Sequence, residues 1–279
     1  MKKAWFDSPD VLYIEKDGIG YVQFANLRKF DNMVTHCFTT RNGGVSRNEY
    51  STLNLGVSKD DPKENVMENF RRISKALGIS HENMVLSNQV HGSRIYVVDE
   101  KDKGKGLTRD SDILGVDGLV TDKPGIALVT FYADCAPLFF LDPVRKVIAV
   151  SHSGWRGTVK QIARETIKVM SERFESRPED VVAAIGPSIG QCCFETGQEV
   201  YDEFTDKLPW SREYCKMSDA GKWHINLRGI IKKTLTDVGL KEGNICVSDI
   251  CTKCNKDIFF SYRGDNGKTG SLAAIMQLL

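Results

Sequence analysis

Residues 147–185 read VIAVSHSGWRGTVKQIARETIKVMSERFESRPEDVVAAI, and this stretch decides the fold. The apolar runs 147–150 and 181–185 each predict a buried strand. Between them, residues 158–174 repeat apolar side chains on one face, among them Ile162 and Met170, which predicts an amphipathic helix. A strand, a loop, a helix and a second strand form the crossover unit of an α/β protein.

Elements on both sides of this unit extend the same pattern. Residues 11–24 contain two β-type runs separated by a short turn, which predicts a hairpin. Gly78 follows a run of helical spacing, at a position suited to a left-handed cap. Further helices are expected at 62–77 and 227–238, and further strands at 126–131, 245–248 and 259–262.

Together these elements predict a mixed sheet that helices cover on both faces. We therefore expect a single-domain α/β/α sandwich over residues 1–279, with the N-terminal strands of 1–35 belonging to the same domain. A hydrophobic content of 41% is enough for a core of this size.

The charge balance limits the classes of partner. Lysine and arginine total 38 against 37 for aspartate and glutamate, so no overall field attracts nucleic acid or a membrane surface, and we expect neither partner. The first residues, MKKAWFDSPDVLYIEKDG, contain no apolar signal segment, which favours a cytoplasmic protein. The eight cysteines are accordingly expected to be reduced thiols.

Three residues in short motifs of unusual composition form a candidate metal site. His91 lies in NQVHG, Cys135 follows Ala133 and Asp134, and His152 lies in SHSGWRG. Two imidazoles and one thiolate make a complete ligand set for a catalytic zinc, which leaves the fourth position to water or substrate. Asp134 has two interpretations, because it either orients a ligand or acts as a base, or only caps a turn.

Five segments together carry a resemblance to a known family. In order along the chain they resemble the YfiH family, also called the laccase-domain family and known for polyphenol oxidases and purine nucleoside phosphorylases, from roughly Thr39 to the C-terminus. The segments are NQVHG (88–92), DGLVTDKPGIALVTFYADCAPLFFLD (117–142), HSGWRGT (152–158), IGPSIGQCCFE (185–195) and CTKCNKDIFFSYRGDNGKTG (251–270).

The resemblance implies a fold, an activity and a metal. It implies an architecture similar to that of the cytotoxic necrotizing factor deamidases, and zinc held by His91, Cys135 and His152 as the catalytic centre. It also implies phosphorolysis of adenosine, inosine, guanosine or methylthioadenosine, together with deamination of adenosine. The expected partners are therefore a purine nucleoside and phosphate, while the oligomeric state stays open.

Two alternatives remain for the same three residues. Two histidines and a cysteine also suit copper, and a copper-dependent polyphenol oxidase (laccase) would need a further oxygen-reducing copper cluster built from many imidazoles. Only five histidines are present in all, which argues against that chemistry. Alternatively, Cys135 with His91 or His152 as base would be a Cys-His hydrolase or deamidase, with amides of the GPSIG loop stabilising the oxyanion.

Polar residues in turn-forming motifs are candidate substrate contacts. Arg41 lies in TTRNGG and Arg263 in FSYRGD, and a guanidinium beside glycine suits a phosphate. Asn54, in LNLG, has an amide suited to orienting water or a nucleoside. Five aromatic residues either stack on a base or belong to the core: Phe131, Tyr132, Trp155, Phe194 and Tyr262.

The remaining cysteines admit several roles. Cys251 and Cys254 have C-x-x-C spacing and Cys246 lies nearby, which allows a second metal or a redox dithiol, although a single C-x-x-C lacks the second half of a zinc ribbon. Cys192 and Cys193 are expected to line or support the pocket.

Overall fold

The computed structural model describes residues 9–279, and within that range most strands belong to two six-stranded mixed sheets. The first sheet has the order β1-β2-β3-β15-β7-β4, with bounds Val11–Lys16, Ile19–Phe24, Val34–Thr39, Leu272–Leu278, Ala127–Tyr132 and Met84–Leu86. The second has the order β14-β10-β8-β9-β6-β5, with bounds Ile245–Val247, Val182–Ile185, Ala136–Asp142, Val147–Ser153, Gly118–Thr121 and Ile95–Val97.

The predicted crossover unit is confirmed. β9 and β10 are each antiparallel to β8, which lies between them, so they run parallel to each other. The helix that connects them is interrupted, however: α3 (Trp155–Val159) and α4 (Ile162–Phe174) replace the single predicted helix. The break falls at Gln161, whose φ of 56° is left-handed, so the chain turns there before the second helix begins.

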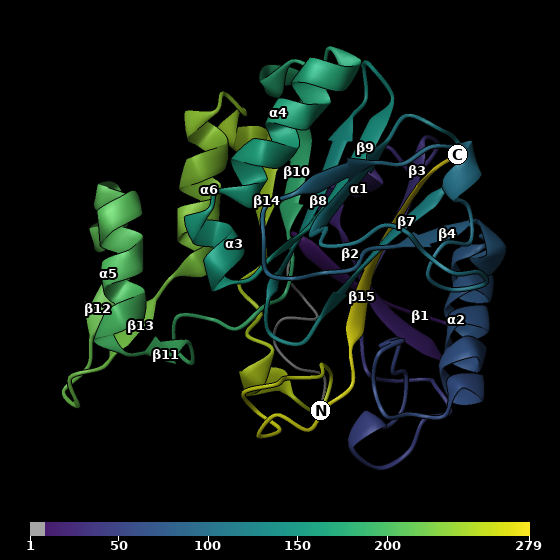
Figure 1. Cartoon of the computed structure of the whole chain (residues 1–279), viewed down its shortest axis with the longest axis horizontal. Coiled ribbons are helices and arrows are strands. Elements are labelled where there is room, and N and C mark those ends of the chain that lie inside the picture. Colours follow the sequence, from purple (N-terminus) through teal and green to yellow (C-terminus); the bar gives the residue numbers. More distant parts are fainter. Residues whose placement is uncertain (1–8) are drawn as a thin grey trace.

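Each sheet has one face in a shared core and one face under helices (Figure 1). Alternate residues of β15 show the arrangement: Ala274 and Met276 pack between the two sheets, whereas Ala273 and Ile275 pack toward α2 (Lys63–Leu77). On the opposite side, Ile162 and Met170 of α4 and Leu235 of α6 (Leu227–Asp237) cover the second sheet. The mixed α/β class, with helices on both outer faces, is therefore confirmed.

The number of sheets differs from the prediction of one sheet. Strands such as β8 and β9 are buried along their whole length, and such strands need cover on both faces. That cover is a helix layer on one side and the other sheet on the opposite side. The apolar pattern of a strand shows that the strand is buried, but not whether a helix or another sheet covers it. The sequence pattern therefore does not distinguish one sheet from two.

Most of the other predicted elements are present. The hairpin β1–β2, the helix α2 with its left-handed cap at Gly78, and the pair α6–β14 match their predicted positions. Residues 259–262, in contrast, form no strand but belong to an irregular segment, and β15 carries the strand character of the C-terminal region.

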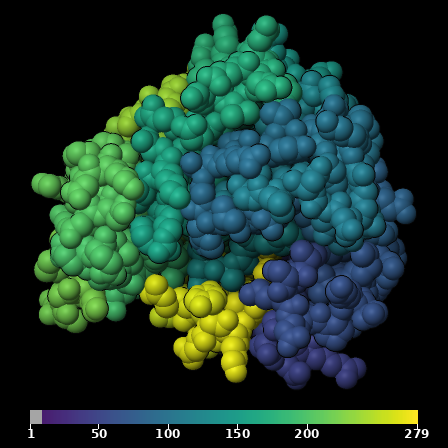
Figure 2. Space-filling view, viewed as in Figure 1, coloured from purple at the N-terminus to yellow at the C-terminus, as the bar shows by residue number. Residues whose placement is uncertain are grey.

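A smaller group of elements lies beside the second sheet. In this group α5 (Gln198–Lys207) packs on a three-stranded sheet of β11 (Glu195–Thr196), β13 (Trp223–Ile225) and β12 (Cys215–Met217). The short helix α1 (Ala25–Arg28) lies outside the group and directly follows β2. In Figure 2 the yellow C-terminal segment lies between this green group and the purple and blue N-terminal segments. Among residues 9–279, no helix has the length and apolar character needed to cross a membrane.

Candidate functional site

The two candidate histidines and the candidate cysteine come together at one edge of the second sheet. Their ligand atoms all lie within 4.8 Å of one another. His152 is in β9, and Cys135 directly precedes β8, whose Pro137 is the ladder partner of His152. His91 arrives from the loop before β5, and its ring lies 4.9 Å from that of His152, nearly perpendicular to it.

Asp117 holds two of these ligands in place. It directly precedes β6, the strand on the other side of β9, and its buried carboxylate contacts Nδ1 of His152 at 2.8 Å. The same carboxylate accepts backbone N–H groups of Val90, His91 and Gly92 at 3.1, 3.0 and 2.7 Å. Burial opposes ionisation, but these donors outweigh it and lower the pKa of Asp117. An ionised Asp117 holds a proton on Nδ1 of His152, so Nε2 is the nitrogen that faces the site and would bind a metal once it loses its own proton.

The protonation of Cys135 is coupled to that of the histidines. Burial raises the pKa of the thiol, but His152 and His91 more than offset it, so the net pKa is lowered. Burial likewise lowers the pKa of His152, while Cys135 and Asp117 raise it more strongly. A thiolate is thus favoured at Cys135, which is the form that binds metal or acts as a nucleophile.

Gly154 leaves room for these ligands. A Cβ atom at this position would lie 2.9 Å from Cδ2 of His91 and 3.0 Å from Sγ of Cys135. No side chain fits there without displacing both, so the motif SHSGWRG needs its glycine because of close approach.

Asp134, the neighbour of Cys135, directs its carboxylate away from the three candidate ligands. Its backbone is left-handed, with a φ of 89°, and its buried carboxylate turns toward the C-terminal segment. There it accepts the hydroxyl of Thr252 at 2.6 Å and the backbone N–H of Arg263 at 2.7 Å. Asp134 therefore ties that segment to the strand end that carries Cys135.

A cavity of about 480 Å³ opens beside the three ligands. That volume lies in the range of sites for small organic ligands. All five aromatic residues in question line it: Phe131, Tyr132, Trp155, Phe194 and Tyr262. Gln89 also lines it, and its side chain pairs with both backbone groups of Phe131 at 2.7 and 2.8 Å, which fixes the loop that carries His91.

The three predicted substrate residues lie in different surroundings. Arg263 lines the cavity, with its guanidinium bonded to the Glu195 carbonyl at 3.0 Å. Arg41 and Asn54 do not line it, which differs from the prediction. The side chain of Arg41 donates to the carbonyls of Ser51 and Lys256 and stacks 4.6 Å from the centre of the Phe260 ring.

Asn54 is fully buried behind the cavity wall. Its amide donates to Asp61 at 2.8 Å and its oxygen accepts the N–H groups of Gly56 and Ser271. Every polar atom of this side chain is therefore engaged in holding the loop.

Three residues of the site have no place in the sequence prediction. Gln89 and Asp117 lie inside motifs that were recognised, next to a ligand and at the start of a strand, so motif context alone could have marked them. Lys59 lines the cavity, and burial lowers the pKa of its ammonium group, which makes no ion pair within residues 9–279. Nothing in its local sequence distinguishes it from a surface lysine.

Comparisons with known proteins point to one family. Residues 35–279 match a family model described as multi-copper polyphenol oxidoreductase laccase. The purine nucleoside phosphorylase YlmD of Bacillus subtilis is 36% identical over 255 residues, 91% of each chain. The adenosine deaminase RL5, from an unknown prokaryotic organism, is 34% identical over 81% of this chain and 87% of its own length.

A solved structure extends the similarity to nearly the whole fold. The crystal structure of YfiH from Bacillus licheniformis superposes with a TM-score of 0.88 at 32% identity, covering 98% of each chain. Sequence and fold lead to the same family, and the chain belongs to the laccase-like YfiH family.

Proposed function

We propose that this chain is a zinc-dependent purine nucleoside enzyme. It would cleave adenosine, inosine, guanosine or methylthioadenosine with phosphate, and would also deaminate adenosine. The observation that carries the proposal is the opening of the group His91, Cys135 and His152 onto the aromatic-lined cavity. Relatives named as a purine nucleoside phosphorylase and an adenosine deaminase support both activities.

The donor set fits zinc in a catalytic rather than a structural role. Two imidazole nitrogens and one thiolate leave one tetrahedral position free, and the cavity adjoins it. Asp117 supplies the carboxylate that commonly orients a metal-binding histidine. When bound, zinc supplies Lewis acidity, which makes water a nucleophile near neutral pH.

The cavity offers separate places for the base and for phosphate. The rings of Phe131, Trp155 and Tyr262 suit stacking on a purine. Arg263 and Lys59 bring the positive charge that suits a phosphate, and the guanidinium can bind two oxygens at once. In phosphorolysis these two cations would hold phosphate against C1′ of the ribose, with the base held by the aromatic side chains.

Laccase chemistry ranks below this proposal because of where the other histidines lie. His36 is buried between the two sheets, where Nε2 accepts the N–H of Phe24. His81 and His224 lie on separate elements. Within residues 9–279, the His91 group alone brings histidines together as candidate ligands, so no second imidazole cluster is available for oxygen-reducing copper.

A Cys-His hydrolase is favoured by the lowered pKa of Cys135 but lacks an oxyanion site in the GPSIG loop. Each N–H of this loop already has an acceptor within the protein, and Pro187 has none to give. The donors are Gly186, Ser188, Ile189 and Gly190. The predicted oxyanion role of this loop is therefore not available in this conformation.

One assay separates the candidates. Purified protein is incubated with adenosine, with and without phosphate, and adenine, inosine and hypoxanthine are resolved. We expect adenine only with phosphate and inosine in both conditions, without oxygen or added copper. Turnover of phenols that requires oxygen, with no product from adenosine, would reverse the ranking.

A further inference from the structure

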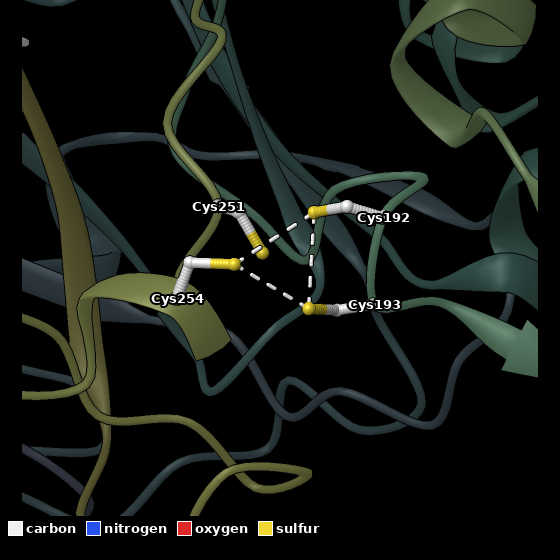
Figure 3. Close-up of side chains that lie close together, drawn as sticks. All are labelled: Cys192, Cys193, Cys251 and Cys254. Atoms are coloured by element: carbon white, nitrogen blue, oxygen red, sulfur yellow. Dashed lines mark hydrogen bonds between the residues drawn. The ribbon is translucent and has the colours of Figure 1, made fainter.

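Four of the eight cysteines meet at a second site outside the His91 group. Cys192 and Cys193 come from the loop after β10, and Cys251 and Cys254 come from the loop after β14. Their sulfur atoms lie within 4.8 Å of one another and point toward a common centre (Figure 3). The C-x-x-C pair thus finds a second pair of thiols 58 residues or more earlier in the chain.

Sheet topology explains why the two loops meet. β10 and β14 are parallel neighbours, so the loops that follow them leave the sheet on the same side. Backbone pairing then continues past the strands. The N–H of Ser188 donates to the carbonyl of Ile250, and the carbonyl of Ser188 accepts the N–H of Thr252. This extension fixes both loops up to the residues that carry the thiols.

The distances between sulfur atoms fit a single tetrahedral metal ion. Cys192 lies 3.7 Å from Cys193 and 3.8 Å from Cys254, and the latter two are 3.5 Å apart. Four sulfurs at 2.3 Å from one zinc are separated by about 3.8 Å. A disulfide requires about 2.05 Å. In an iron–sulfur cluster the four thiolates are divided among two or more iron atoms, so they cannot all lie this close together.

The surroundings suit a centre with excess negative charge. The N–H of Gly190 donates to Sγ of Cys251 at 3.2 Å, a contact that stabilises a thiolate. The guanidinium of Arg228 is held against this loop by the carbonyls of Ser248 and Ile250. Four thiolates around Zn²⁺ carry a net charge of −2, and Arg228 partly balances it.

We propose that Cys192, Cys193, Cys251 and Cys254 bind a second zinc ion as a closed, structural tetrathiolate site. With four protein ligands it has no open position, in contrast to the three-ligand group at the cavity. Its role is to fasten together two loops that form one wall of that cavity. Ile189 and Phe194 flank the first thiol pair, and Tyr262 and Arg263 follow the second.

Metal content tests the proposal in protein purified with its native metal. By elemental analysis, wild type should contain about two zinc ions per chain, and Cys254→Ser should contain about one. Cys135→Ser removes a ligand of the other site and should also leave about one, while the double variant should contain none. Cys215→Ser is the matched control, because this thiol lies in neither group, and it should retain both ions.

A spectroscopic measurement on wild type covers the case in which the variants do not fold. Zinc X-ray absorption should fit an average of two environments, with sulfur as the majority ligand at about 2.3 Å. Cys135→Ser should shift that fit toward sulfur alone.

The proposal is overturned by unchanged zinc in a folded Cys254→Ser variant, by iron in place of the second zinc, or by a disulfide among the four thiols in the purified protein. Nucleoside activity does not enter this test, so failure of the proposed function leaves it intact.

Discussion

At the scale of single residues, Asp117 and Asp134 show how position decides the role of a carboxylate. Asp117 stands beside β9, so it faces His152 and the amides of the His91 loop. Asp134 precedes Cys135 in sequence, yet its carboxylate turns away and binds the C-terminal segment instead. A carboxylate next to a candidate metal ligand in sequence, such as Asp134, therefore does not hold that ligand. A carboxylate on the neighbouring strand, such as Asp117, does.

Arg263 and Arg41 give a matched pair of substitutions. Replacing Arg263 by Met removes a cation from the cavity, so the KM for phosphate in phosphorolysis should rise roughly tenfold, with deamination less affected. Arg41→Met removes the contacts to the Ser51 and Lys256 carbonyls. It should lower the free energy of unfolding by about 1–3 kcal/mol without changing the KM for phosphate.

Steady-state kinetics at varied phosphate and urea unfolding distinguish the two arginines. An equal rise of the phosphate KM in both variants would contradict the separation of their roles.

The sequence predicted those site residues that stand in a distinctive local motif, and missed those whose position depends on the path of distant loops. His91, Cys135 and His152 stood out because rare residue types occur in unusual motifs. Arg41 and Arg263 occupy similar turn contexts, and only the path of the surrounding loops places one in the cavity and the other outside it. Lys59 carried no distinguishing signal.

At the scale of elements, the break between α3 and α4 shows the limit of periodicity. Apolar spacing continues from Val159 to Met170, so the pattern predicts one helix, and both helices do bury that face. Gln161 interrupts the backbone without interrupting the pattern, because side-chain spacing does not record a single left-handed residue. Similarly, the two cysteine pairs became one site only through the pairing of β10 with β14.

This break predicts opposite effects at adjacent positions. Gln161 has a φ of 56°, where a side chain is strained, so Gln161→Gly should stabilise the protein or leave its stability unchanged. Lys160 has a φ of −77°, so Lys160→Gly should lower the free energy of unfolding by up to about 1 kcal/mol. Urea unfolding of both variants tests the pair, and a larger loss at Gln161 than at Lys160 would refute the argument.

At the scale of the whole molecule, the two sheets bury a histidine whose protonation is unfavourable in the folded state. His36 of β3 packs against the rings of Phe24 and Phe139, and burial lowers its pKa to about 3. Unfolding returns the pKa to about 6.5, so below that pH the unfolded chain binds the extra proton. The contribution of neutral His36 is therefore complete above about pH 6.5 and is lost as the pH falls toward 3.

The expected loss from this one residue is about 2 kcal/mol between pH 7 and pH 5. The side chain of the His36→Gln variant cannot be protonated, so the free energy of unfolding of this variant should fall less over the same interval. The difference between wild type and the variant gives the contribution of His36. Urea unfolding at both pH values measures it. His81→Gln serves as the control, and equal slopes for wild type and His36→Gln would exclude the effect.

The position of β15 has a consequence for synthesis on the ribosome. This strand, Leu272–Leu278, lies between β3 and β7 in the middle of its sheet. Until it has emerged, the nascent chain carries two unpaired strand edges and an incomplete core, both of which are prone to wrong association. Closure of the first sheet therefore waits until β15 has been synthesised, and until then the growing polypeptide stays prone to aggregation.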